Sequence, residues 1–205
     1  MQRALVDATR TVFTRVGYHG MSVELVIAEA RLSRPTFYKY FTSVDEPIEL
    51  VLAEVNQALI DGILSAIAQA RAPYEKVEAG LLAWRRWGEQ LGPMLRPLFS
   101  ELHDEYSPVS HYRRESIQVL KRSWVDATAA LGRPPTQEHV LDALIHGIEF
   151  LGYRYQLESD GSDASWKGTR DTMLRLAFGV LASETELAQA NVLLKVLNVD
   201  LSPTG

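Results

Sequence analysis

Residues 22–41 read SVELVIAEARLSRPTFYKYF and contain two short helical patterns separated by a polar break. In the first pattern, apolar residues recur at helical spacing after Ser22, a residue type that caps helix starts. In the second, Pro35 follows Ser33 and fits a first helical turn, because its missing N–H would be unpaired there. This layout predicts a helix-turn-helix, whose second helix can enter the major groove of DNA.

The second helix carries side chains that suit contacts with DNA. Arg34 and Lys39 can bind phosphates or guanine, and the hydroxyl of Thr36 can reach a base edge or the backbone. We expect DNA contacts from Ser22, Arg34, Pro35, Thr36, Tyr38, Lys39 and Tyr40. The alternative, an ordinary helical bundle with a solvated basic face, is not excluded by the spacing alone.

Residues about 4–55 resemble the N-terminal domain of the TetR (tetracycline repressor-like) family of bacterial transcription regulators. The shared elements are Phe13, Gly17-Tyr18, Ser22-Val23, Ala30, Leu32-Ser33, Thr36-Phe37-Tyr38, Tyr40-Phe41 and Ser43, followed by a long helix. The resemblance implies an all-α homodimer with a ligand-binding C-terminal domain. It also implies a repressor that a small molecule releases from a near-palindromic operator in double-stranded DNA.

Three residues depart from the family pattern. Arg31 replaces a glycine that commonly makes the turn, and Val44 replaces a lysine that contacts phosphate. Ile27 replaces an alanine between the first two helices. If the backbone at Arg31 has positive φ, arginine costs roughly 1 kcal/mol relative to glycine.

Charge is distributed unevenly along the chain. The whole sequence has 26 acidic and 21 basic residues, whereas residues 1–44 have a net charge of +3 and the remainder −8. We call residues 1–44 the head; its charge suits DNA despite the acidic total. There is no cysteine, no visible signal peptide and no apolar run of the roughly 18 residues that span a membrane. We therefore expect a cytoplasmic protein with no membrane partner.

The periodicity predicts an all-α chain with no strand. The expected helices cover about 2–16, 22–30, 33–40, 43–70, 74–91, 94–105, 108–131, 137–157, 165–182 and 184–197, and a capping box is expected between Ser43 and Glu46. We expect a three-helix DNA-binding domain over 1–45, a connecting helix over about 43–70, and a helical-bundle domain for ligand binding and dimerisation over 46–205. The expected core of the first domain is Leu5, Val12, Phe13, Val26, Ala30, Leu32, Phe37 and Phe41.

The C-terminal bundle has two candidate surfaces. Bulky rings on separate helices can enclose a small apolar or aromatic effector, although core or interface packing is the better explanation for any single ring. The expected pocket residues are Trp84, Trp87, Phe99, Tyr106, Trp124, His146, Glu149 and Phe150. The last two long helices are apolar around much of their circumference, which favours a second subunit, the alternative being central helices of a monomeric bundle. The expected interface residues are Leu141, Leu144, Ile148, Leu151, Leu174, Phe178 and Leu181.

Other functions have weaker support. Asp142 and His146 share a helix face, but no HExxH or paired ExxH motif accompanies them. No phosphate loop or nucleophile elbow is present, so we expect no enzyme, no metal and no cofactor. The main alternative to a ligand-responsive repressor is a helical small-molecule-binding module whose DNA binding is weakened or lost.

Overall fold

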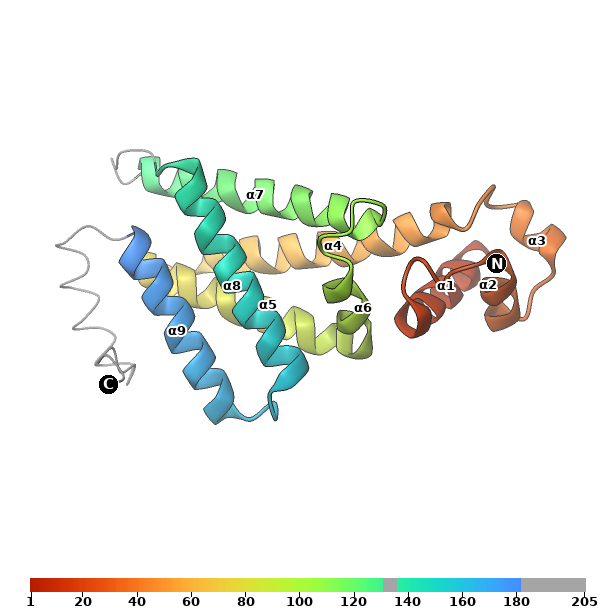
Figure 1. Ribbon diagram of the computed structural model, residues 1–205. Coiled ribbons are helices and arrows are strands. Elements are labelled where there is room, and N and C mark those ends of the chain that lie inside the picture. The colour runs from red at the N-terminus through yellow and green to blue at the C-terminus, as the bar shows by residue number, and fades with distance from the viewer. Residues whose placement is uncertain (131–135, 182–205) are drawn as a thin grey trace. The chain divides into compact units, whose positions relative to one another are not determined.

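The computed structural model describes residues 1–130 and 136–181, and all regular structure in these ranges is helical (Figure 1). The elements are α1 (Gln2–Val16), α2 (Val23–Ala30), α3 (Arg34–Tyr38), α4 (Asp45–Gln69), α5 (Pro73–Leu91), the 3₁₀ helix η1 (Gly92–Met94), α6 (Leu95–Ser100), α7 (Pro108–Ala130), α8 (Glu138–Glu158) and α9 (Asp163–Leu181). The all-α prediction is confirmed. The helix expected over 184–197 lies outside the described residues.

Two predicted helices are shorter in the structure. The third ends at Tyr38 because the amide of Tyr40 bonds back three residues, to Phe37, and leaves the α-helical pattern. The helix expected over 94–105 is a 3₁₀ turn followed by α6, which ends at Ser100. After α6, successive hydrogen bonds between an amide and the carbonyl three residues earlier form turns up to the start of α7 at Pro108.

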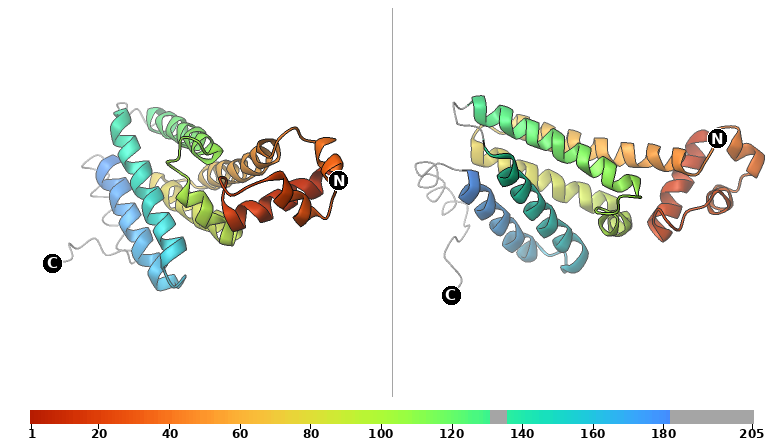
Figure 2. Two further views of the ribbon diagram at one scale, coloured as in Figure 1. Left: turned by 45° about the vertical axis from the view of Figure 1, so that its right-hand side comes forward. Right: turned by 45° about the horizontal axis from the view of Figure 1, so that its top comes forward.

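By packing, the chain divides into two compact units. Unit 1 comprises Met1–Asp61 and Trp87–Gln118, and unit 2 comprises Gly62–Arg86 and the chain from Val119 onward. This division does not follow the functional boundary expected at residue 45, which stays a prediction. In both turned views the head helices α1 and α2 of unit 1 lie together, as do α8 and α9 of unit 2 (Figure 2).

The core of unit 1 joins the head to the first half of α4. Of the eight apolar residues that the sequence suggests for the head core, six are buried: Leu5, Val12, Phe13, Val26, Phe37 and Phe41. Ala30 and Leu32 are partly exposed. From α4, Ile48 and Val51 are fully buried in the same unit.

In unit 2, α8 and α9 pack side by side around Tyr155, Trp166 and Leu174. The guanidinium of Arg85 lies 5.5 Å from the ring centre of Tyr155 and 5.0 Å from that of Trp166. Such contacts between a cation and aromatic faces tie α5 to both helices.

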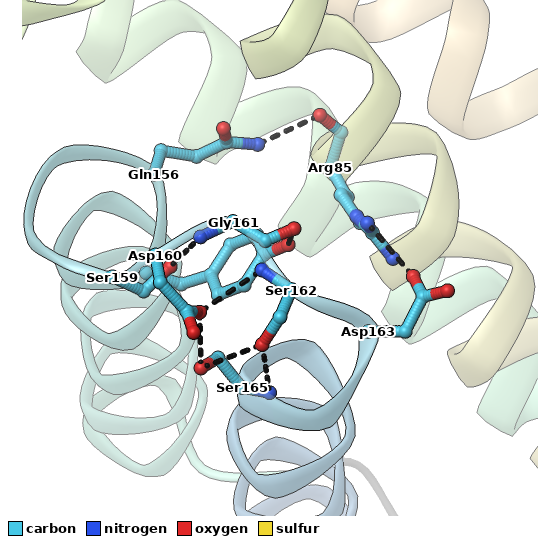
Figure 3. A network of polar contacts seen from close by, with 9 residues as sticks. Arg85, Gln156, Ser159, Asp160, Gly161, Ser162, Asp163 and Ser165 are labelled. Atoms are coloured by element: carbon cyan, nitrogen blue, oxygen red, sulfur yellow. Dashed lines mark hydrogen bonds and ion pairs between the residues drawn. The ribbon is translucent and has the colours of Figure 1, made fainter.

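The turn between α8 and α9 is closed by short polar side chains (Figure 3). The Asp160 carboxylate accepts the amide of Ser162 at 3.0 Å and the hydroxyl of Ser165 at 2.6 Å. These bonds, led by that from Ser165, lower the pKa of Asp160 to about 2. Gly161 supplies the positive φ of 71° that the turn needs.

One helix, α4, is long and apolar enough to cross a membrane by length and composition. The helix still contains no uninterrupted apolar run of that length, since Glu54 and Asp61 fall within it. Within unit 1 the helix uses its apolar side for packing, since Ile48, Val51, Leu52 and Val55 are all buried there. A core helix of a globular bundle has the same apolar composition.

Candidate nucleic-acid interface

Helix α3, the second helix of the motif, has one buried side chain. Phe37 is 0% exposed, and its ring lies 5.7 Å from the ring of Phe41, which is also buried. A helix of five residues has little stability of its own, so this anchor fixes its orientation. The neighbouring Tyr38 is 46% exposed, which directs the remaining face of α3 outward.

Hydroxyl groups begin both helices of the motif, as the sequence predicts. Ser22 accepts the amide of Leu25 at 3.3 Å, and Ser33 accepts the amide of Thr36 at 3.4 Å. Ser33 also bonds the Thr36 hydroxyl at 2.8 Å. The Thr36 hydroxyl is therefore already oriented by the cap, which leaves its methyl group as the freer contact for a base.

The turn between the two helices requires a left-handed residue. Arg31 has φ 54° and ψ 42°, with its amide bonded to Ala28 at 3.2 Å and the next amide, of Leu32, bonded to Ile27 at 3.0 Å. These bonds form a Schellman motif, whose left-handed position usually holds glycine. The departure from the family pattern thus costs roughly 1 kcal/mol of backbone strain.

The exposed face of α3 is cationic and aromatic. Arg34 pairs with Glu24 on α2 at 2.5 Å and donates a longer bond of 3.4 Å to the Tyr38 hydroxyl. The Tyr38 hydroxyl, more than Glu24, raises the pKa of the guanidinium. Lys39 lies 6.0 Å from the ring centre of Tyr40. Arg34, Pro35, Tyr38 and Lys39 are exposed, whereas Ser22, Thr36 and Tyr40 are half-buried.

The start of α4 is acidic. The capping box expected between Ser43 and Glu46 is wrong: Glu46 accepts the amide and the hydroxyl of Thr42, and Ser43 bonds Asp45. The Thr42 hydroxyl, followed by its amide, lowers the pKa of Glu46. Val44 adds no charge here, so this end of the motif offers carboxylates where a phosphate contact would need a cation.

The loop after α1 is tied to the end of α6, an arrangement that the sequence did not reveal. The amide of Tyr18 and the hydroxyl of Ser107 each donate to the buried carboxylate of Glu101 at 2.7 Å. A Cβ added at Gly17 would meet a carboxylate oxygen at 2.6 Å, and Gly17 has a positive φ of 68°, so a larger residue would strain the backbone and displace the carboxylate. His19 and Asp104 make a second link of 2.5 Å.

A polar hollow of about 370 Å³ lies beside this loop, within unit 1. Its lining includes Tyr18, Glu49, Tyr106, His111 and Tyr112. Tyr106 was expected to line an apolar effector pocket, but it is 84% exposed and borders this hollow instead.

The other expected pocket residues fall in both units. In unit 1, Trp87 is buried and donates to the Val55 carbonyl at 3.1 Å, and Phe99 is half-buried on α6. In unit 2, Trp84 packs edge-on against Tyr153 and fills the space above Gly152.

Unit 2 also holds the remaining pocket candidates. His146 bonds the Asp142 carbonyl at 2.7 Å, and Glu149 and Trp124 are half-buried. The Trp124 indole N–H is buried without a partner. Phe150 is 53% exposed. Across residues 1–130 and 136–181, no three acidic, His or Cys side chains gather where they could hold a metal.

The expected interface residues divide by burial. Leu141, Leu144 and Leu174 are buried within the protomer, whereas Ile148, Leu151 and Phe178 are partly buried against the unit 2 core. The side chain of Leu181 lies outside the described residues. Among the described side chains of α8 and α9, the large apolar ones most exposed are Phe150 and Leu176, and neither is among the expected interface residues.

The comparisons with known proteins agree with this geometry. Residues 5–46 match the family model of bacterial regulatory proteins, tetR family. This match, with the structural neighbours below, confirms the resemblance that the sequence suggested. A search of curated protein sequences finds no significant match.

Among solved structures, the fold is similar to that of a candidate transcriptional regulator from Pseudomonas aeruginosa PAO1, with TM-score 0.71, 15% identity, and coverage of 87% of this chain and 89% of that one. A TetR family transcription regulator from Marinobacter aquaeolei VT8 has a TM-score of 0.65 and 18% identity, with coverage of 85% of this chain and 94% of that one. The fatty acid degradation regulator FadR from Bacillus halodurans has a TM-score of 0.64 and 16% identity, with coverage of 84% of this chain and 94% of that one. At such identities these likenesses establish the fold.

Proposed function

We propose that this chain, which carries the N-terminal domain of the TetR family of bacterial transcription regulators on an all-α fold, binds operator DNA through α3 and is released by a small molecule. The observation that carries the proposal is the polarity of α3. Phe37 is fully buried, while Arg34, Tyr38 and Lys39 face solvent from the same short helix. Such a helix offers cations and hydrogen-bonding groups to the major groove.

The test uses DNA that the protein itself selects from a random-sequence duplex library. We expect the affinity for the selected duplex to fall steeply with salt, because each neutralised phosphate releases counterions. Replacing Arg34 or Lys39 by Ala should weaken binding roughly tenfold each. Arg122→Ala, at an exposed position on α7, is the matched control and should bind as the wild type does. Failure to retain any duplex, or an affinity independent of salt, would overturn the proposal.

A homodimer follows from the same proposal, since two heads are needed to read two half-sites roughly 34 Å apart. We infer that the outward face of α8 and α9 forms the interface. Phe150 and Leu176 are exposed on it, next to small residues such as Ala143 and Gly179 that allow close approach. Leu176→Glu should give a monomer in light scattering. Val125→Glu, equally 39% exposed but on α7, should remain a dimer.

Effector release would act through the links between the head and α6. Glu101 fixes the loop after α1, so a ligand that shifts α6 would also shift the head within unit 1. A ligand lowers DNA affinity only by its preference for the shifted state. We expect an apolar or aromatic molecule to raise the melting temperature and to dissociate the complex. A Glu101→Gln variant should keep the first effect and weaken the second.

The alternative function, a small-molecule-binding module without DNA activity, has specific observations in its favour. The turn is strained at Arg31, Val44 offers no cation, and Glu24 already pairs with Arg34. Under this alternative, substituting Arg34 would leave DNA retention unchanged while the thermal response to the effector persists.

A further inference from the structure

Arg31 is the one residue other than glycine with positive φ in the ranges that the structure describes. The amides of Arg31 and Leu32 make the two hydrogen bonds of the Schellman turn, and a glycine at position 31 would allow the same bonds without strain. The turn itself therefore gives no reason for an arginine. Residues held in unfavourable backbone regions concentrate at functional sites, so a strained residue that the turn does not require points to a role for its side chain.

The Arg31 side chain differs from the other guanidinium groups of the head. Arg3 and Arg10 pair with Glu54, Arg15 pairs with Glu29, and Arg34 pairs with Glu24. Arg31 is exposed and has no ion pair or hydrogen bond from its side chain to any of the described residues. It is thus the arginine of the head whose charge is available without breaking a contact.

The position of Arg31 is next to the DNA-contacting elements. It directly follows Ala30, the last residue of α2, and lies three residues before Arg34, the first residue of α3. In a docked helix-turn-helix, the first helix crosses the phosphate backbone and the start of the second enters the groove. The turn between them therefore lies close to backbone phosphates.

We propose that Arg31 binds a DNA phosphate and supplies the cation that the acidic start of α4 lacks. This inference rests on the proposed function. A guanidinium presents a planar set of donors that matches phosphate oxygens, and it stays charged at all physiological pH values. The unfavourable backbone of Arg31 is then retained for a contact that forms only on DNA.

The test compares the wild type, three variants of Arg31 and Arg34→Ala on a duplex that the wild type selects from a random-sequence library. Arg31→Gly should raise the melting temperature and yet lower DNA affinity roughly tenfold, opposite directions that a purely structural role would not produce. The slope of log affinity against log salt should become shallower by about 0.9, as expected for one lost phosphate contact. Arg31→Asn tolerates the left-handed backbone, and its salt slope should become shallower by the same amount as that of Arg31→Gly. The salt slope of Arg31→Lys should equal that of the wild type.

Two results would overturn the inference. One is an Arg31→Gly protein that binds with unchanged affinity and slope while Arg34→Ala is impaired; the proposed function would then stand without Arg31. The other is an Arg31→Lys protein whose slope equals that of Arg31→Gly. If the wild type selects no duplex at all, the proposed function fails, and the role of Arg31 fails with it.

Discussion

The turns α2–α3 and α8–α9 both contain a residue with positive φ, but the residue differs between them. Each reverses the chain through one left-handed residue, Gly161 with φ 71° in the second and Arg31 with φ 54° in the first. Around Gly161 the polar groups bond to one another, and Asp160 accepts from both Ser162 and Ser165. At Arg31 the backbone is satisfied but the side chain is not. A turn that serves only the fold uses glycine, and a turn that departs from this rule indicates a second requirement.

The largest effect is expected at Phe37, the buried residue that anchors the helix after the α2–α3 turn. Phe37→Ala should lower the free energy of unfolding by roughly 3–5 kcal/mol, because the fully buried ring leaves a cavity under α3. DNA binding should disappear at the same time. Tyr38→Ala, at the next and half-exposed position, should weaken DNA binding with little change in denaturant midpoint. Equal losses of stability in the two variants would contradict the assigned orientation of α3.

Substituting each of the two left-handed residues tests the comparison directly. Gly161→Ala should cost about 1 kcal/mol, through φ alone, because an added Cβ would meet no atom within 4 Å. Arg31→Gly should gain about the same amount. Urea unfolding of both variants measures the two changes. A loss of stability in Arg31→Gly would mean that the arginine side chain stabilises the free protein after all.

Acid should weaken the α8–α9 turn specifically. The pKa of Asp160 is lowered from 3.8 to about 2, so its contribution to stability is present above pH 3.8 and is lost as pH falls through about 2. Asp160→Asn removes the charge but keeps an acceptor. The denaturant midpoint of the wild type should exceed that of Asp160→Asn near neutral pH and converge on it below about pH 2. A constant difference across this range would exclude the carboxylate as its cause.

The sequence predicted the head better than its connections. Periodicity identified α1 to α3 and six of eight core residues, because local spacing alone decides which face of a short helix is apolar. It could not reveal that Glu101 accepts the amide of Tyr18, since a bond between residues far apart in the chain leaves no periodic signal. For the same reason Leu174, expected at an interface, is buried in its own unit, while Leu176 two residues later is exposed.

The smallest expected effect concerns the ion pair that distinguishes Arg34 from Arg31. Glu24 and Arg34 are each 59% exposed, so solvent screens their attraction and Glu24→Gln should leave the denaturant midpoint nearly unchanged. The substitution frees Arg34 and removes a negative charge beside the DNA. Affinity for the selected duplex should therefore rise roughly twofold, most clearly at low salt. Glu29→Gln is the matched control, because Glu29 also lies on α2 and pairs with Arg15 of α1. This substitution should change affinity less. Equal gains in both variants would mean that overall charge, and not the release of Arg34, governs binding.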